Sequence, residues 1–161
     1  MSGRFLRSFG THGTRIGQFD KPYYIHITKD NKVLVSDCSN HRIQVFGNWN
    51  YFKFFWLYFD WIIIPFKDTM GFPLFAFGSE GTNPGEFKHP RGVTSDNEGF
   101  WLVADSGNSR IQVFRNDGTY VSHFGTSGSD SGKFRGLEGV TVAANGDIIL
   151  CDKENHRVQI I

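Results

Sequence analysis

The residues whose types could best do chemistry belong to a short sequence motif, here called the phrase, that the chain repeats three times. Each copy reads Asp, two variable residues, Asn, one residue and Arg, and the copies begin at Asp37, Asp105 and Asp152. A calcium site would need several oxygen ligands around one ion, and the acidic density of the phrase is too low for that. Asp and Asn side chains also accept hydrogen bonds from nearby backbone N–H groups in tight turns. We therefore predict a structural turn at each copy and no metal site.

The arginine that closes each phrase is also predicted to be structural. A guanidinium group makes strong hydrogen bonds to carboxylate and carbonyl groups. A site for one ligand would break the repeat, so an arginine present in all three copies favours a role in the architecture. The predicted structural set is Asp37, Asn40, Arg42, Asp105, Arg110, Asp152, Asn155 and Arg157.

The histidines and cysteines form no recognisable catalytic motif. The sequence has no Cys-x-x-Cys pair, no His-Glu-x-x-His, no P-loop and no Gly-x-Ser-x-Gly. His41 and His156 occupy the same position of the phrase, between Asn and Arg, where a turn residue is the simpler interpretation. We therefore expect a chain without catalytic residues and without a cofactor.

The composition indicates which classes of binding partner and which cellular compartment to expect for this chain. The chain has 161 residues and a formal net charge of +1, which gives no bulk electrostatic case for nucleic-acid binding. Cys38 and Cys151 fall at different positions of the repeat, so the repeat does not pair them. Two unmatched cysteines, and a start without a signal-peptide pattern, predict reduced thiols in a cytoplasmic protein.

The turns are predicted to connect short β-strands in a repeating unit. Equivalent residues of successive copies are separated by 68 and then 47 positions. In the second copy, apolar or alternating runs predict strands at 74–77, 93–95, 100–104 and 110–114, with hairpin turn signals between them. Four short strands in a unit of this length, without a helical pattern, are typical of β-propeller blades. The predicted fold class is therefore all-β.

Several phrases resemble a known repeat. Pro-x-Gly-Val, a strand ending in Val-Ala-Asp, and Asn-x-Arg-Ile-Gln-Val-Phe are similar to the NHL repeat, and the similarity covers nearly all of the chain outside 47–67. Phe-Gly-Ser-Glu-Gly at 77–81 and Asn-His-Arg at 40–42 and 155–157 most resemble the C-terminal propeller of tripartite-motif NHL proteins. The resemblance implies a partial β-propeller of NHL repeats, with about three of six four-stranded blades. The remaining blades are expected in the full-length protein.

The repeats divide the chain into four segments. Repeat 1 is expected at 1–46, repeat 2 at 68–114, and repeat 3 at 115–161 with its last strand missing. An aberrant aromatic insert at 47–67 interrupts the hairpin turn between repeats 1 and 2. Because an open half-propeller leaves strand edges unprotected, we expect a fragment or a truncated gene model. A short protein that dimerises into a ring is the alternative.

Three interpretations of the insert compete, and its composition differs from the rest, since it holds three of the four Trp residues. A membrane-spanning helix over 49–66 is disfavoured because it is barely long enough, contains Lys53 and Asp60, and ends in Pro65. A blade insertion that docks on the propeller or on a partner would be an exposed apolar patch. We favour an intron retained and translated in frame, because Phe, Tyr, Trp, Asn, Ile and Lys suit T-rich and AT-rich codons.

One rim of the predicted propeller gathers residues that differ between the copies. The loop that enters the innermost strand of a blade and the turn between its second and third strands lie on the same side, here called the turn rim. The x of Pro-x-Gly is Arg91 in the second copy, and Tyr23 and Glu138 stand at the aligned positions of the first and third copies, near the central channel. Tyr can stack on an unpaired base, and Arg can bind a phosphate or a base edge.

The resemblance gives this rim a function. Related NHL propellers bind RNA there, as single-stranded motifs or stem-loops, in support of post-transcriptional regulation. Glu138 and Glu154 depart from a basic pattern in the third copy. The candidate contacts with RNA or another partner are Tyr23, Lys88, Arg91, Asn108, Lys133, Arg135 and His156.

Two other functions follow from the same resemblance. The propeller could select protein substrates for a RING-type E3 ubiquitin ligase whose catalytic domain lies outside this chain. Some NHL-like propellers are lyases that bind zinc and calcium on the central axis, which requires histidines lining a closed channel, and His26 alone is a weak candidate. We therefore expect a non-catalytic binding module, with RNA as the first partner and a protein substrate as the alternative.

Overall fold

The computed structural model describes residues 3–48 and 70–161, and its regular elements are β-strands and single 3-10 turns. The first sheet, called blade 1, holds β1 (Pro22–Ile27), β2 (Val33–Asp37), β3 (Arg42–Asn48) and β4 (Met70–Phe77) in that order. Neighbouring strands are antiparallel, and the 3-10 turn η1 (Cys38–Asn40) joins β2 to β3. The sheet is thus a simple up-and-down meander.

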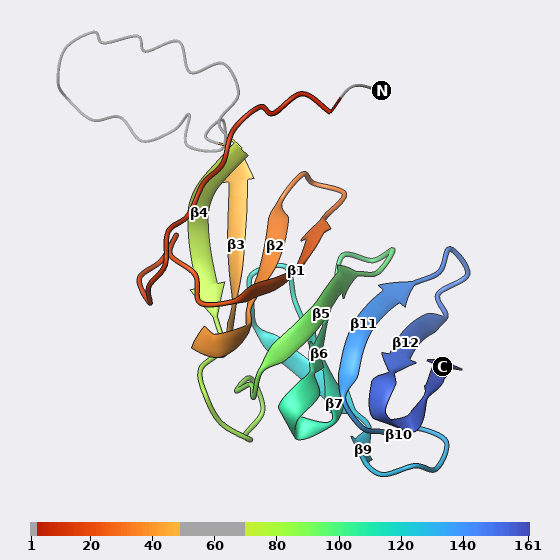
Figure 1. The fold of residues 1–161 in the computed structure, drawn as a ribbon. Helices are drawn as coiled ribbons and strands as arrows, with labels where there is room; N and C mark the ends of the chain where they lie inside the picture. Colours follow the sequence, from red (N-terminus) through yellow and green to blue (C-terminus); the bar gives the residue numbers. More distant parts are fainter. Residues whose placement is uncertain (1–2, 49–69) are drawn as a thin grey trace, which may run out of the picture.

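The next two sheets repeat this meander (Figure 1). Blade 2 holds β5 (Pro90–Ser95), β6 (Trp101–Asp105), β7 (Arg110–Phe114) and β8 (Tyr120–Phe124), with η3 (Ser106–Asn108) between β6 and β7. Blade 3 holds three strands, β11 (Leu137–Val142), β12 (Ile148–Asp152) and β13 (Arg157–Ile160), with η4 (Lys153–Asn155). The loop that enters blade 3 contains a short parallel pair, β9 (Thr126–Ser127) and β10 (Lys133–Phe134). The predicted all-β partial propeller is confirmed.

The outermost strand of each complete blade comes from the segment that follows it in sequence. β8 pairs with β7 through a tight turn in which the Arg115 N–H donates to the Thr119 carbonyl at 2.8 Å. Gly118 in this turn has φ +84°, a conformation that glycine adopts without steric cost. In the same way β4, from segment 68–114, pairs with β3. The blades are therefore offset by one strand from the repeats of the sequence.

The expected insert at 47–67 overlaps the end of β3. Gly47 and Asn48 continue this strand and pair with Phe72 and Met70 of β4. The remainder of the insert, with its three interpretations, lies outside the described residues. In 3–48 and 70–161, no helix has the length and apolar character needed to cross a membrane.

The hydrophobic core lies between the blades rather than within one of them. Leu34, Ile43 and Val45 of blade 1 pack against Trp101 and Val103 of blade 2 in one buried cluster. A second cluster joins blades 2 and 3 through residues such as Leu102, Ile111, Phe134 and Leu150. Because β-strand side chains alternate between the two faces of a sheet, the middle blade is buried on both. The blades are therefore stacked face to face and fan out around one edge, as Figure 1 shows.

The innermost strands form that common edge. β5 lies between β1 and β11 and contacts both. The approach to β11 is close at Gly92, where an added Cβ would lie 2.6 Å from the Glu138 carbonyl oxygen. A residue with a side chain would force β5 and β11 apart there, which explains a glycine in a strand. The residues that begin these three strands are consequently brought together on the turn rim.

Candidate binding surface

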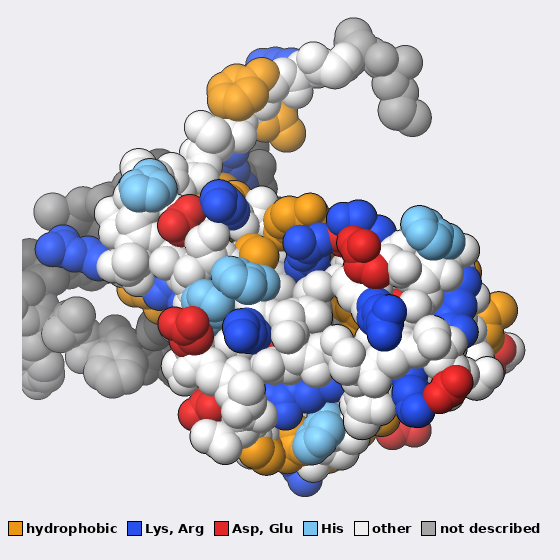
Figure 2. Space-filling model, turned by 60° about the horizontal axis from the view of Figure 1, so that its bottom comes forward, with side chains coloured by type: hydrophobic (Ala, Val, Ile, Leu, Met, Phe, Trp, Pro, Cys, Tyr) orange, Lys and Arg blue, Asp and Glu red, His pale blue; other side chains and the backbone are white. Residues whose placement is uncertain are grey.

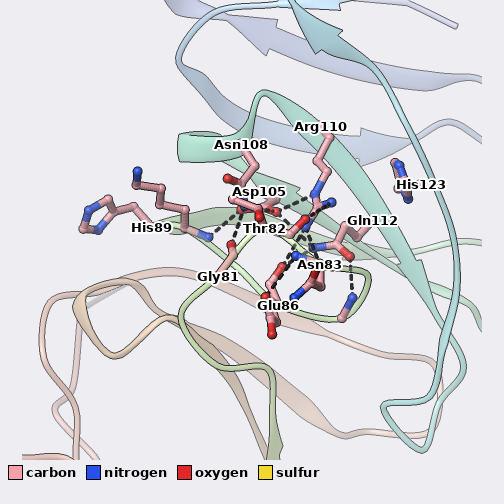
Figure 3. Close-up of polar contacts among 12 residues, drawn as sticks. Gly81, Thr82, Asn83, Glu86, His89, Asp105, Asn108, Arg110, Gln112 and His123 are labelled. Atoms are coloured by element: carbon pink, nitrogen blue, oxygen red, sulfur yellow. Dashed lines mark hydrogen bonds and ion pairs between the residues drawn. The ribbon is translucent and has the colours of Figure 1, made fainter.

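A buried carboxylate organises each turn of the turn rim, and Figure 3 shows the arrangement in blade 2. Asp105 has no solvent exposure. Its Oδ1 accepts a hydrogen bond from the Lys88 N–H at 2.7 Å. Its Oδ2 accepts from three side-chain donors: Asn108 Nδ2 at 2.8 Å, Arg110 Nε at 2.8 Å and Gln112 Nε2 at 3.0 Å. Four donors satisfy the carboxylate completely, as burial of a charge requires.

The same side chains fasten the long loop that precedes β5. The terminal nitrogens of Arg110 donate to the carbonyl groups of Thr82, Asn83 and Glu86 at 2.8–3.0 Å. Gln112 donates to the Glu86 carbonyl at 2.6 Å and accepts from the Gly85 N–H at 2.9 Å. Figure 3 shows these contacts converging between loop and sheet. These polar contacts, together with the fully buried side chain of Phe87, fix the position of the loop.

Blades 1 and 3 contain the same network. Asp37 and Asp152 are also fully buried, and each accepts hydrogen bonds from an Asn, an Arg and a Gln at 2.8–3.0 Å. The glutamines were absent from the set predicted from sequence. Their signal was the constant Gln two residues after each Arg, at Gln44, Gln112 and Gln159.

Asn108, one of the candidate ligand contacts, is also part of this network. Its amide group donates to the Gly81 carbonyl at 2.9 Å and to Asp105 at 2.8 Å. Asn40 and Asn155 make the equivalent pairs of contacts in the other two blades. The amide donors of Asn108 are therefore engaged in the turn, and its contact with a ligand stays a prediction.

The innermost strands bring Tyr23, Arg91 and Glu138 into one row across the three blades. The Arg91 guanidinium lies over the Tyr23 ring, 4.8 Å from its centroid. An Nη1 donor of Arg91 forms an ion pair with Glu138 on the next blade. Tyr23 remains 50% exposed, and its ring stacks at 5.8 Å on the ring of Tyr24. The row is therefore an aromatic and cationic platform open to solvent at the Tyr23 end.

The predicted cationic residues on this rim differ in the exposure and the ion pairing of their side chains. Lys88 and Arg135 occupy equivalent positions; their backbone N–H groups bind Asp105 and Asp152, while their side chains are exposed. Lys133 is half-buried, and its ammonium pairs with Asp130 at 2.6 Å. His156 is exposed, with a left-handed backbone, φ 53°. Figure 2 shows Lys and Arg side chains spread over this rim with acidic groups among them.

Two polar contacts on the turn rim were not anticipated from sequence. The His89 N–H donates to His41 Nδ1 at 3.2 Å, and the two rings lie 4.6 Å apart between blades 1 and 2. Lys153 Nζ lies 3.5 Å from Glu138 Oε1, so the Glu138 carboxylate contacts both Lys153 and Arg91. The histidine contact joins adjacent blades and the Lys153 contact joins two elements of blade 3, and patterns within a single strand reveal neither. Within the residues that the structure describes, no three His, Cys, Asp or Glu side chains gather as a metal site would require.

Acid is expected to weaken the third blade. Although burial acts to raise it, hydrogen bonds from the Arg135 N–H and the Asn155, Arg157 and Gln159 side chains lower the pKa of Asp152 below its usual value. A carboxyl with a lowered folded-state pKa stabilises the fold above its unfolded pKa, about 3.9, and loses this contribution as the pH falls through the folded value.

Urea unfolding between about pH 2 and pH 6 measures this effect. The parent chain should lose stability steeply below about pH 4, whereas Asp152→Asn should be less stable at neutral pH and lose less on acidification. An equal pH dependence for both proteins would contradict the assignment.

The fold and the repeated network define the class of this protein as a β-propeller built from repeats. Among solved structures, it resembles virginiamycin B lyase from Staphylococcus aureus with a TM-score of 0.57 and 14% identity over 88% of this chain and 38% of the lyase. It resembles an auxiliary nutrient binding protein from Bacteroides thetaiotaomicron with a TM-score of 0.61 and 15% identity over 83% of this chain and 35% of that one. At such identities the likeness shows the fold alone.

The repeats themselves are NHL repeats: the family model of the NHL repeat matches residues 25–46, 87–114 and 134–161. The rat E3 ubiquitin-protein ligase TRIM71 is 47% identical over 51 residues, which are 32% of this chain and 6% of the ligase. The Drosophila melanogaster protein brain tumor is 29% identical over 133 residues, covering 68% of this chain and 13% of that protein. The predicted relationship to tripartite-motif NHL proteins is thus confirmed, and this chain spans a small fraction of their length.

Proposed function

We propose that the chain is a binding module that recognises single-stranded RNA on its turn rim. The observation that carries the proposal is the Tyr23–Arg91 platform, an exposed ring with a guanidinium 4.8 Å from its centroid. Unpaired bases stack on aromatic rings and on guanidinium planes, and this is the common mode of single-strand recognition. Stacking requires no bulk positive charge, so the net charge of +1 is compatible with it.

The surroundings of the platform support the same function. Glu138 holds one end of the Arg91 guanidinium, which reduces the entropy that Arg91 would lose on meeting a base. Lys88 and Arg135 extend exposed side chains from loops whose backbones are fixed by Asp105 and Asp152. Cations on fixed loops can bind phosphates and so position the strand whose bases are stacked. The proposed mechanism is therefore base stacking at Tyr23 and Arg91, with phosphate contacts at Lys88 and Arg135.

In-vitro selection from a random-sequence RNA library tests this function. The chain should enrich a motif, and Tyr23→Ala/Arg91→Ala should bind that motif roughly 10- to 100-fold more weakly, since each stacked base contributes about 1–3 kcal/mol. Affinity should also fall as salt rises, with a slope set by the phosphate contacts. Binding is measured by fluorescence anisotropy at several salt concentrations.

Arg115→Ala is the matched control, because it removes an exposed arginine at the opposite rim, in the turn between β7 and β8. It should leave RNA affinity unchanged. Absence of an enriched motif, or equal binding by the double variant, would exclude RNA recognition by the platform. A protein substrate would then be the favoured partner, since one relative of this chain is named an E3 ubiquitin-protein ligase.

A further inference from the structure

Each innermost strand is entered through a residue with a left-handed backbone. This residue is Lys21 before β1, His89 before β5 and Gly136 before β11, with φ of 53°, 49° and 62°. The three positions are separated by 68 and 47 residues, which are the offsets of the repeat. The left-handed conformation is therefore a requirement of the blade, and a different residue type meets it each time.

Hydrogen bonds from the 3-10 turn hold the backbone in this conformation. In blade 1, the Lys21 carbonyl accepts from the Cys38 N–H at 3.3 Å. In blade 2, the carbonyl of Lys88, which precedes His89, accepts from the Gly107 N–H at 2.7 Å. An unfavourable backbone conformation persists where the surrounding contacts determine it in this way.

Glycine is the residue type that meets this requirement without strain. In the left-handed region other L-residues bring their Cβ too close to the following carbonyl oxygen, whereas glycine has no Cβ. Lys21 and His89 also each precede a proline, which restricts the backbone before it further. Gly136 shows that glycine is compatible with this position of a blade. Lys21 and His89 are therefore retained at a conformational cost, and strain of this kind clusters at functional sites.

Packing does not explain the two side chains, because both are exposed. Among the residues that the structure describes, the Lys21 ammonium forms no hydrogen bond or ion pair. The His89 ring lies 4.6 Å from the His41 ring, but the hydrogen bond to His41 Nδ1 comes from the His89 backbone N–H. Glycine at either position would keep the backbone contacts, so the side chains themselves are available to a ligand.

Both side chains lie beside the Tyr23–Arg91 platform. Lys21 is two residues before Tyr23, and His89 is two residues before Arg91. Burial raises the pKa of the Cys38 thiol, and the positive charges of Arg91 and Lys21 act against this rise, so both cations lie close to Cys38. This line of contact between the blades is here called the seam, and it contains Lys21, Cys38 and His41 of blade 1 and His89 and Arg91 of blade 2.

The seam is better suited to a phosphate than the corresponding line between blades 2 and 3. There, Glu138 and Glu154 lie 3.5 and 3.4 Å from the Lys153 ammonium, so two carboxylates share its charge. Asp20 is an acidic neighbour of Lys21 in sequence, but within the described residues no ion pair engages the Lys21 ammonium. An unpaired ammonium can bind a phosphate without first losing another partner.

We propose that Lys21 and His89 extend the RNA site along the seam, Lys21 by binding a phosphate and His89 by stacking on a base. This inference rests on the RNA-binding function proposed above. Lysine binds phosphate as a point charge, and histidine is one of the aromatic side chains on which unpaired bases stack. The bound strand would then continue past Tyr23 and Arg91 over the side chains that precede them.

Replacement by glycine separates binding from stability. In Lys21→Gly and His89→Gly the melting temperature should be unchanged or raised, because the relief of strain offsets the entropy that glycine adds to the unfolded chain. Affinity for a fluorescein-labelled random-sequence RNA of about 12 nucleotides should fall roughly fivefold for Lys21→Gly and roughly 5- to 100-fold for His89→Gly. Fluorescence anisotropy measures the affinity. A lowered melting temperature would identify side chains that stabilise the fold and would overturn the proposal.

Asn31→Gly is the matched control, because Asn31 is also exposed and left-handed, with φ 60°, but lies in the turn between β1 and β2 on the opposite rim. It should leave RNA affinity unchanged. Lys21→Arg keeps the charge and should retain most of the affinity that Lys21→Gly loses.

The salt dependence identifies the phosphate contact. Lys21→Gly should reduce the slope of log affinity against log salt by about 0.7, the value for one phosphate of a single strand. His89→Gly should leave the slope unchanged at about pH 8, where an imidazole is neutral. RNA binding by the parent chain with unchanged affinity in either glycine variant would overturn this inference alone. Absence of RNA binding by the parent chain would overturn the proposed function and this inference with it.

Discussion

Asp105→Ala is expected to lower the free energy of unfolding by about 3–5 kcal/mol, because it leaves a buried guanidinium without its counterion. Arg110 is 8% exposed and Asp105 is fully buried, so solvent does not replace the lost carboxylate. The variant also removes the acceptor of the Lys88 N–H and of two amide side chains. Urea unfolding followed by tryptophan fluorescence measures the loss.

Two further variants show whether the buried charge causes the effect. Asp105→Asn keeps the shape of the side chain and should lose less stability than Asp105→Ala, because its carbonyl oxygen still accepts hydrogen bonds. Glu98→Gln removes an acidic charge from the exposed turn between β5 and β6 and should change stability by less than about 0.5 kcal/mol. A loss below about 1 kcal/mol for Asp105→Ala would mean that the network contributes little to the fold.

Trp101→Ala is expected to cost a similar 3–5 kcal/mol, through a cavity between blades 1 and 2. Trp101 is 1% exposed, and its ring stacks on Phe75 at 6.2 Å and on Phe77 at 5.8 Å. Both phenylalanines belong to β4, the outer strand of blade 1. The indole therefore joins two sheets, and its removal should uncouple them. Thermal and urea unfolding measure the change.

The size of the replacement side chain provides the control. Trp101→Phe retains an aromatic ring in the same space and should cost clearly less than Trp101→Ala, because the cavity is smaller. Trp101→Val places at this position the residue type of Val33, its counterpart in blade 1, and should fall between the two. Equal losses for all three variants would indicate that Trp101 acts through a particular contact, such as Lys32 over its ring at 5.7 Å, and not through volume.

The two variants also bear on the proposed RNA site in different ways. Asp105 fixes the backbone of Lys88, a proposed phosphate contact. Trp101 holds together the two blades that supply Tyr23 and Arg91, whose stack crosses between β1 and β5. The site is therefore a property of the assembled blades, and its residues depend on packing at some distance from the rim.

The sequence by itself determined the class of fold and the repeating turn. Alternating strands, hairpin turns and threefold recurrence of Asp, Asn and Arg are local patterns, and local patterns suffice for a meander whose neighbouring strands are adjacent in the chain. The same recurrence separated constant residues, such as Arg110, from variable ones, such as Tyr23, Arg91 and Glu138. Residues that recur in every blade have a structural role in the blade, and this inference requires only the sequence.

The tertiary structure decided which side chains meet across blades. The stack of Arg91 on Tyr23, its ion pair with Glu138, and the contact of His89 with His41 join residues whose separation in sequence ranges from 47 to 68. The commitment of the Asn108 amide to the turn also depended on a loop carbonyl 27 residues away. These contacts are set by the angle and distance between stacked sheets. The angle and distance depend in turn on core side chains from both sheets. That is why spacing along one strand did not predict them.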